Sequence, residues 1–139
     1  MYDKVVELIN QYEEKGDFTY AVVNDVIIAE AEKVLNVNIP EQYQWFLKRY
    51  GHGGIGGIET LGVGKNGKTI FANKTLEFRE YGLPNEMIVI ENCDEWIYCI
   101  DTKNGNIDMW SLGEKKCSLA YKDFFEYLID RMNDAIENM

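Results

Sequence analysis

The residues from Gly62 to Thr69 match the phosphate-binding pattern G-x-x-x-x-G-K-T letter for letter. In a P-loop, backbone N–H groups wrap the phosphates, the lysine reaches the terminal phosphates and the threonine holds magnesium. That chemistry requires a buried strand before the loop, a helix after it and a parallel sheet around it. Residues 55–61 contain two glycines, which disfavours a buried central strand. A surface glycine turn is the favoured interpretation, and a small nucleotide-binding protein is kept as the weakest alternative.

Carboxylates gather around the end of one predicted strand, at Glu91, Asp94, Glu95 and Asp101. Paired carboxylates can act as a general acid and base or bind a metal ion. The only histidine is distant in sequence, so a solvated rim is favoured first, a partner-binding acidic surface second and catalysis third. We therefore expect no catalytic residue, no metal site and no cofactor, and we predict that the chain is not an enzyme.

The other reactive side chains form no recognisable catalytic set. His52 stands between glycines in a flexible loop, which predicts an exposed and inert side chain. The cysteines lack zinc-site spacing, and we expect buried free thiols in a reducing cytoplasm; they are Cys93, Cys99 and Cys117. The tryptophans have few basic neighbours, so core packing is favoured over base stacking; they are Trp45, Trp96 and Trp110.

The charge of the chain is strongly acidic and uneven. The 139 residues carry a formal net charge of −10; residues 77–139 hold 14 acidic and 6 basic side chains (net −8), whereas residues 1–76 hold 10 and 8 (net −2). Phosphate contacts need Lys and Arg, so direct nucleic-acid binding is disfavoured. An acidic half suits a basic protein partner, although the solubility of a cytoplasmic protein explains the charge equally well.

Length and hydropathy predict one cytoplasmic domain spanning residues 1–139. No apolar run reaches the roughly 18 residues of a membrane span. The start of the chain mixes charges into an amphipathic pattern, unlike a secretory signal. We expect no membrane partner, and the oligomeric state is left open.

Helical signals dominate the first fifty residues. A first amphipathic helix is predicted to end near Lys15 and Gly16, and Asn24 or Asp25 can cap a second. Pro40 suits the first position of a third helix, and Gly51 can close it. The apolar stripe of that helix follows i, i+3, i+4, i+7 spacing and comprises Tyr43, Phe46, Leu47 and Tyr50.

Strand signals dominate the second half. Residues 58–63 are a weak strand candidate, and a helix is predicted from about Asn73 to Tyr81. Residues 87–90, 96–100 and 107–110 predict three strands, with a turn at Asn104-Gly105 between the last two. A long final helix is predicted from Tyr121 to Met139. This order predicts an α+β fold in which helices pack on a twisted, mainly antiparallel sheet.

Ordered short motifs along most of the chain resemble the SUKH superfamily, which includes a yeast cell-wall synthesis regulator and many bacterial immunity proteins. The matching segments are Ile39-Pro40-x-x-Tyr43-x-x-Phe46-Leu47, Tyr50-Gly51-x-Gly53-Gly54, Tyr81-Gly82-Leu83-Pro84, Ile88-Val89-Ile90, Asp94-Glu95-Trp96, Asp101, Gly105-x-Ile107-x-x-Trp110 and Ala120-Tyr121-x-x-Phe124. The chain departs from the family pattern at Ile39, where Leu is more frequent. It also has a longer glycine loop, and it carries Ala120-Tyr121 in place of a Ser-Phe pair.

The resemblance implies a SUKH-like α+β domain without catalysis, and in bacteria a cytoplasmic immunity protein that neutralises a toxin. A nuclease toxin is the favoured partner, because its basic phosphate-binding site suits an acidic inhibitor. The predicted partner-binding residues are Glu59, Glu91, Asp94, Glu95, Asp101 and Asp108. A regulatory protein-interaction module of cell-wall or signalling type is the alternative. Toxin identity, interface and affinity stay open.

Overall fold

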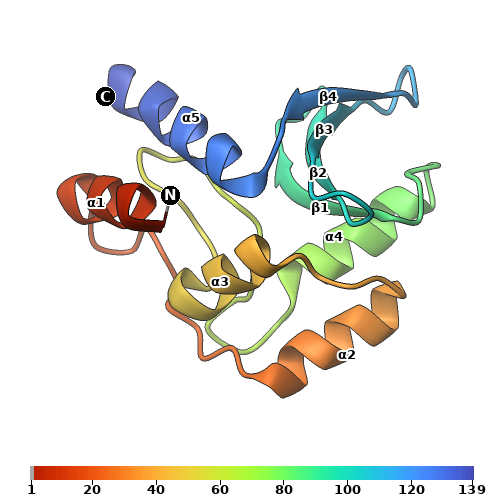
Figure 1. Cartoon of the computed structure of the whole chain (residues 1–139), viewed down its shortest axis with the longest axis horizontal. Coiled ribbons are helices and arrows are strands. Elements are labelled where there is room, and N and C mark those ends of the chain that lie inside the picture. The colour runs from red at the N-terminus through yellow and green to blue at the C-terminus, as the bar shows by residue number, and fades with distance from the viewer. Residues whose placement is uncertain (1) are drawn as a thin grey trace.

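The first half of the chain forms four helices. The computed structural model describes residues 2–139 and contains α1 (Tyr2–Tyr12), α2 (Asp25–Leu35), α3 (Glu41–Tyr50) and α4 (Ile70–Arg79). α2 packs against α4, and α1 packs against the C-terminal helix α5 (Phe124–Glu137) (Figure 1). None of the helices within residues 2–139 combines the length and the hydrophobicity needed to cross a bilayer.

The predicted stripe of α3 is confirmed, since all four of its apolar residues are buried. The helix begins one residue later than predicted, because Pro40 has φ −57° and ψ 146° and is the N-cap. Gly51 ends it at φ 80°, and its N–H donates to the carbonyl of Leu47. The N-cap of α2 is Asn24, whose side chain accepts from the N–H of Ile27 at 3.0 Å.

The second half forms a four-stranded antiparallel sheet. Its strands are β1 (Met87–Asn92), β2 (Ile97–Asp101), β3 (Ile107–Trp110) and β4 (Cys117–Tyr121), in the order β1-β2-β3-β4. The turn at Asn104-Gly105 is confirmed: Gly105 has φ 80° and donates its N–H to the Asp101 carbonyl at 2.7 Å. The predicted α+β class with a long C-terminal helix is confirmed.

β4 is absent from the strands predicted from the sequence, and Tyr121, predicted to begin the last helix, is instead the last residue of this strand. β4 is an edge strand with two exposed residues, Ser118 and Leu119, so it lacks the apolar run that marks a buried strand. α5 begins only at Phe124, after Asp123, whose side chain accepts from the Glu126 N–H at 2.8 Å. Asp123 is thus the N-cap of α5, so the start of this helix does not depend on a side-chain hydroxyl at position 120.

Two helix boundaries and one predicted strand also differ from the prediction. α1 ends at Tyr12, and α4 begins at Ile70 instead of Asn73. Residues 58–63 form no regular strand; they make isolated bridges from Thr60 to Gly53 and from Val63 to Thr69. The loop between α3 and α4 is therefore an irregular connection, held by isolated bridges and by hydrogen bonds such as that from the Leu61 N–H to the Ile90 carbonyl at 2.7 Å.

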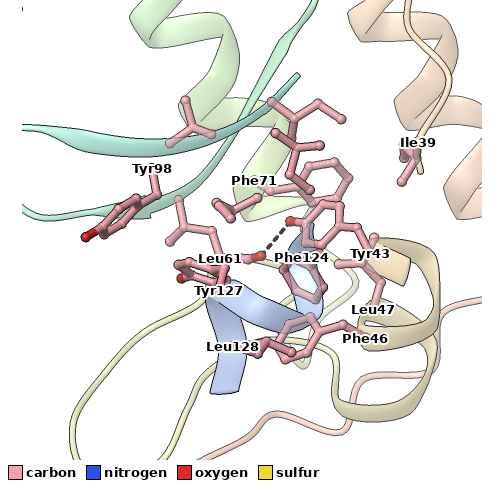
Figure 2. Close-up of a cluster of buried hydrophobic side chains, with 14 of the residues drawn as sticks. Ile39, Tyr43, Phe46, Leu47, Leu61, Phe71, Tyr98, Phe124, Tyr127 and Leu128 are labelled. Carbon is pink, nitrogen blue, oxygen red and sulfur yellow. Dashed lines mark hydrogen bonds between the residues drawn. The ribbon is translucent and has the colours of Figure 1, made fainter. Parts of the chain in front are cut away.

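The core lies where α3, α4, α5 and the sheet meet. Figure 2 shows the side chains of Tyr43, Phe71, Phe124 and Tyr127 converging there from three helices. The Tyr43 hydroxyl is buried and donates to the carbonyl of Leu61 at 2.6 Å. Burial raises the pKa of this phenol well above its usual value. This bond ties the long loop to α3 and helps to fix the loop against the core.

Candidate partner-binding surface

The Gly62–Thr69 pattern lies in a self-contained turn without a P-loop frame. The Gly64 N–H donates to the Lys68 carbonyl at 2.9 Å, and the Gly67 N–H donates to the Gly64 carbonyl at 2.9 Å. The Lys68 N–H is also used, by the Asn66 side chain at 3.0 Å. No regular strand precedes the turn within residues 2–69, and the described sheet is antiparallel. The backbone N–H groups of Gly64, Gly67 and Lys68 therefore already donate hydrogen bonds within the turn and do not point to a phosphate site, which argues against nucleotide binding here.

Glu91 is not on an exposed acidic surface, contrary to the sequence-based expectation. Its side chain is 7% exposed, and both carboxylate oxygens are paired. Arg131 donates from Nη2 to Oε2 at 2.6 Å and from Nε to Oε1 at 3.0 Å. The Tyr127 hydroxyl donates to Oε1 at 2.8 Å and lies 3.1 Å from the Thr60 hydroxyl. Glu91 therefore joins β1, α5 and the long loop, and its pairing removes it from the surface that we propose for binding.

The same carboxylate shifts the pKa of its neighbours. Its hydrogen bonds raise the pKa of Arg131 above its ordinary value, so this guanidinium is permanently charged. Burial and then Glu91 raise the pKa of the Cys93 thiol to about 12. Cys93 and Cys117 are half-buried and Cys99 is buried, and all three are free thiols. The raised pKa favours the protonated Cys93 thiol, which is unreactive because the thiolate is the reactive form.

His52 is a structural residue, contrary to the expectation of an exposed side chain. Its side chain is 12% exposed. Nδ1 accepts from the Gly62 N–H at 2.9 Å, and Nε2 lies 3.2 Å from Oε1 of Glu59. An accepting Nδ1 requires the proton on Nε2, which is then placed to donate to Glu59. Glu59 is exposed to solvent, and one of its carboxylate oxygens contacts His52.

The turn between β1 and β2 presents Asp94 and Glu95 as free carboxylates. The Cys93 N–H donates to the Trp96 carbonyl at 2.9 Å, which closes the turn. Asp94 has φ 68°, and its N–H is held by the Asn92 side chain at 3.0 Å. Both carboxylates are exposed, and no cationic group within residues 2–139 lies within 4.0 Å of them. They are therefore available to a basic partner.

Asp101 and Asp108 lie on a different part of the sheet. Asp108 pairs with Cys99 across β2 and β3, so it shares a sheet face with Asp101 two residues further along β2. Burial, followed by the charge of Asp101, raises the pKa of Asp108 above its ordinary value. Asp101 lies six positions after Glu95, at the far end of β2, which corresponds to a separation of roughly 20 Å in extended chain. The predicted residues thus form separate groups, and only Asp94 and Glu95 stand together at the turn.

Two hollows flank this turn, and sequence reasoning found neither. The larger, about 640 Å³, lies between the long loop, α4 and α5, and is lined by Glu59, Lys74, Glu91 and Arg131 among others. The smaller, about 290 Å³, lies between α4 and the turn. Trp96 lines both. The Asp94-Glu95-Trp96 motif pointed to the turn side of the smaller hollow. Nothing in the sequence indicated that residues of α4 form its other side.

Comparisons with known proteins agree with this architecture. A family model described as SMI1-KNR4 cell-wall, SUKH_5, matches residues 3–133. The chain belongs to this SUKH family. A crystal structure of a protein from Pseudomonas syringae pv. tomato is similar to this SUKH chain at a TM-score of 0.66 and 23% identity, covering 79% of this chain and 83% of the other. That likeness shows the shared fold.

Proposed function

We propose that this SUKH-family chain is a cytoplasmic immunity protein that binds a basic protein toxin, with a nuclease as the favoured class, and blocks its active site. The observation that carries the proposal is the β1–β2 turn, which presents Asp94 and Glu95 exposed and without ion-pair partners among residues 2–139. The turn lies in the half of the chain with net charge −8. Electrostatic complementarity of this kind accelerates association with a basic partner.

The proposed mechanism is steric and electrostatic occlusion without chemistry. A nuclease must carry basic groups to hold phosphate, so a rigid acidic turn can occupy the same site. The turn is fixed by three strand-end hydrogen bonds: Cys93 to Trp96, Glu95 to Cys93 and Asp94 to Asn92. A pre-ordered turn loses little conformational entropy on binding.

The decisive experiment pairs the chain with the toxin encoded beside its gene. The purified toxin is assayed for nuclease activity on DNA and RNA with increasing amounts of the protein. Stoichiometric loss of nuclease activity, together with a one-to-one complex, is the expected result. Full nuclease activity at a large excess of the protein would overturn the proposal for that toxin, and survival of toxin-expressing cells provides the matching test in vivo.

A regulatory interaction module is the second candidate, and the family description favours it because it names a cell-wall protein group. The same exposed turn would then bind a regulatory or envelope-synthesis protein. A stable complex with such a protein, combined with no protection against the neighbouring toxin, is the outcome expected for this candidate.

A further inference from the structure

The smaller hollow beside the β1–β2 turn combines aromatic walls with an acidic rim. Four aromatic side chains line it, namely Phe78, Tyr81, Trp96 and Trp110, and Asp94 and Glu95 also line it. We propose that this aromatic hollow receives an arginine side chain of the basic protein partner. The proposal rests on the proposed function and deepens it, because it identifies the chemical group that anchors the partner.

The aromatic rings offer both faces and edges around the hollow. The rings of Phe78 and Trp110 lie 6.1 Å apart at 87°, and those of Phe78 and Tyr81 lie 6.4 Å apart at 71°. Tyr81 is 48% exposed, so this wall is open to a partner. A cation over an aromatic face is attracted by the ring quadrupole, and tryptophan is the strongest such partner.

The charge around the hollow is negative and largely unopposed. Asp94 and Glu95 have no ion pair among residues 2–139, while Glu77, which also lines the hollow, pairs with Lys74 at 2.7 Å. No Lys, Arg or His of the described chain lines the hollow. The hollow therefore lacks a resident cation and suits one brought by a partner.

Two of the residues that line this hollow, Trp96 and Trp110, carry a buried indole N–H that has no hydrogen-bond acceptor within residues 2–139. Trp110 is only 1% exposed, and its Nε1 has no partner; Nε1 of Trp96 is also buried and unpartnered. Buried indole N–H groups normally donate a hydrogen bond, so binding that turns either ring toward the hollow lets an oxygen acceptor of the occupant satisfy its N–H. A bare cation has no such acceptor, whereas a residue within a peptide chain supplies its backbone carbonyl.

Arginine fits this combination better than lysine. Its guanidinium is planar, stacks on aromatic rings and donates in a fork that matches carboxylates such as Asp94 and Glu95. It is also more weakly hydrated than an ammonium group, which favours transfer into a partly apolar hollow. A basic toxin is rich in such side chains, so the requirement is compatible with the proposed partner class.

The first test uses the full chain labelled with ¹⁵N and follows its three indole N–H signals by NMR. The probe is N-acetyl-arginine N-methylamide; the matched controls are the citrulline analogue, which has the same shape without charge, and the lysine analogue. We expect the signals of Trp96 and Trp110 to shift with the arginine probe, less with lysine and not with citrulline, while Trp45 is unchanged. No shift, or equal shifts with citrulline, would overturn the proposal.

Two variants test the parts of the hollow separately. The pair Asp94→Asn with Glu95→Gln is expected to weaken arginine-probe binding about tenfold. The matched pair Glu30→Gln with Glu137→Gln removes the same charge elsewhere and is expected to leave binding unchanged. Trp96→Phe keeps a ring but removes one N–H, and it is preferred to a Trp110 variant because Trp110 is part of the core. Equal loss in both charge pairs would assign the effect to net charge and reject the hollow.

The experiments separate this inference from the proposed function. Probe binding without toxin inhibition would support the hollow and reject the immunity role. Toxin inhibition that survives Asp94→Asn, Glu95→Gln and Trp96→Ala together would support the immunity role and reject the hollow as the anchor site.

Discussion

The carboxylate of Glu91 on β1 and the guanidinium of Arg131 on α5 form a bidentate ion pair. Nη2 donates to Oε2 at 2.6 Å, and Nε donates to Oε1 at 3.0 Å. Glu91 is buried, whereas the Arg131 side chain is 19% exposed. Tyr127 and Thr60 extend the network to the long loop. A carboxylate in this position requires its partner, because a buried and unpaired charge strongly destabilises a fold.

Removing only the cation should destabilise the protein severely. We expect Arg131→Met to lower the free energy of unfolding by about 3 kcal/mol, because Glu91 then remains buried without a counter-charge. Adding Glu91→Gln should restore part of the loss, since the amide oxygen can still accept from Tyr127. Urea unfolding of the single and double variants measures both effects. A double variant less stable than Arg131→Met would contradict the prediction.

His52 should make stability depend on pH. Burial lowers its pKa from the ordinary 6.5, and Glu59 only partly offsets this shift. The unfolded state therefore binds a proton first, so stability is full above about pH 6.5 and falls as the pH drops towards the folded-state pKa. Protonation also removes the acceptor for the Gly62 N–H.

The control for this pH effect is His52→Asn, which offers an oxygen acceptor but does not titrate. Unfolding free energies from about pH 7.5 to about pH 5.5 should fall more steeply in the parent protein than in this variant. Parallel curves would show that His52 does not contribute.

Gly62 should be required for packing, whereas Lys68 of the same motif should be dispensable. A Cβ on Gly62 would lie 1.8 Å from the Gly51 carbonyl oxygen, so Gly62→Ala forces the backbone to move. We expect a loss of about 2 kcal/mol or more. Lys68→Ala alters an exposed side chain and should change stability by less than about 0.5 kcal/mol. Thermal unfolding with and without ATP and magnesium checks both; an ATP-dependent shift abolished by Lys68→Ala would instead support nucleotide binding.

Charge reversal at the β1–β2 turn should slow association with the toxin. Asp94→Lys with Glu95→Lys is expected to lower the association rate and to weaken its dependence on salt, because steering by this turn is lost. Glu30→Lys with Glu137→Lys makes the same change of net charge at other exposed sites. Stopped-flow or surface-binding kinetics at several salt concentrations compare the pairs. Identical rates for both would remove the turn from the binding surface.

Prediction from sequence worked best where the signal is local. The stripe of α3, the cap predicted at Asn24 or Asp25 and found at Asn24, and the Asn104-Gly105 turn each depend on residues within about two helical turns or one hairpin. β4 was missed because an edge strand with an exposed face needs no apolar run. The ordered motifs were enough to identify the family, which the family model over residues 3–133 confirms.

The candidate site was only partly predictable. The sequence located Asp94 and Glu95 beside a strand end, and they are exposed in the structure. It could not show that Glu91, three residues before Asp94, is buried, because its partner Arg131 is 40 residues away along the chain. It also could not show that His52 contacts Gly62, because loop residues have no periodicity that reports their contacts.

The sequence by itself determined the helices, the Asn104-Gly105 turn, the acidic half and the family, because these features depend on composition or on patterns of residues close together in the chain. Only the tertiary structure decided which carboxylates are buried and which face solvent. It also brought Phe78 of α4 and Tyr81, just beyond that helix, around one hollow with Trp96 and Trp110 from the sheet region. The physical reason is that burial and pocket shape depend on side chains from distant elements, which meet only when the core packs.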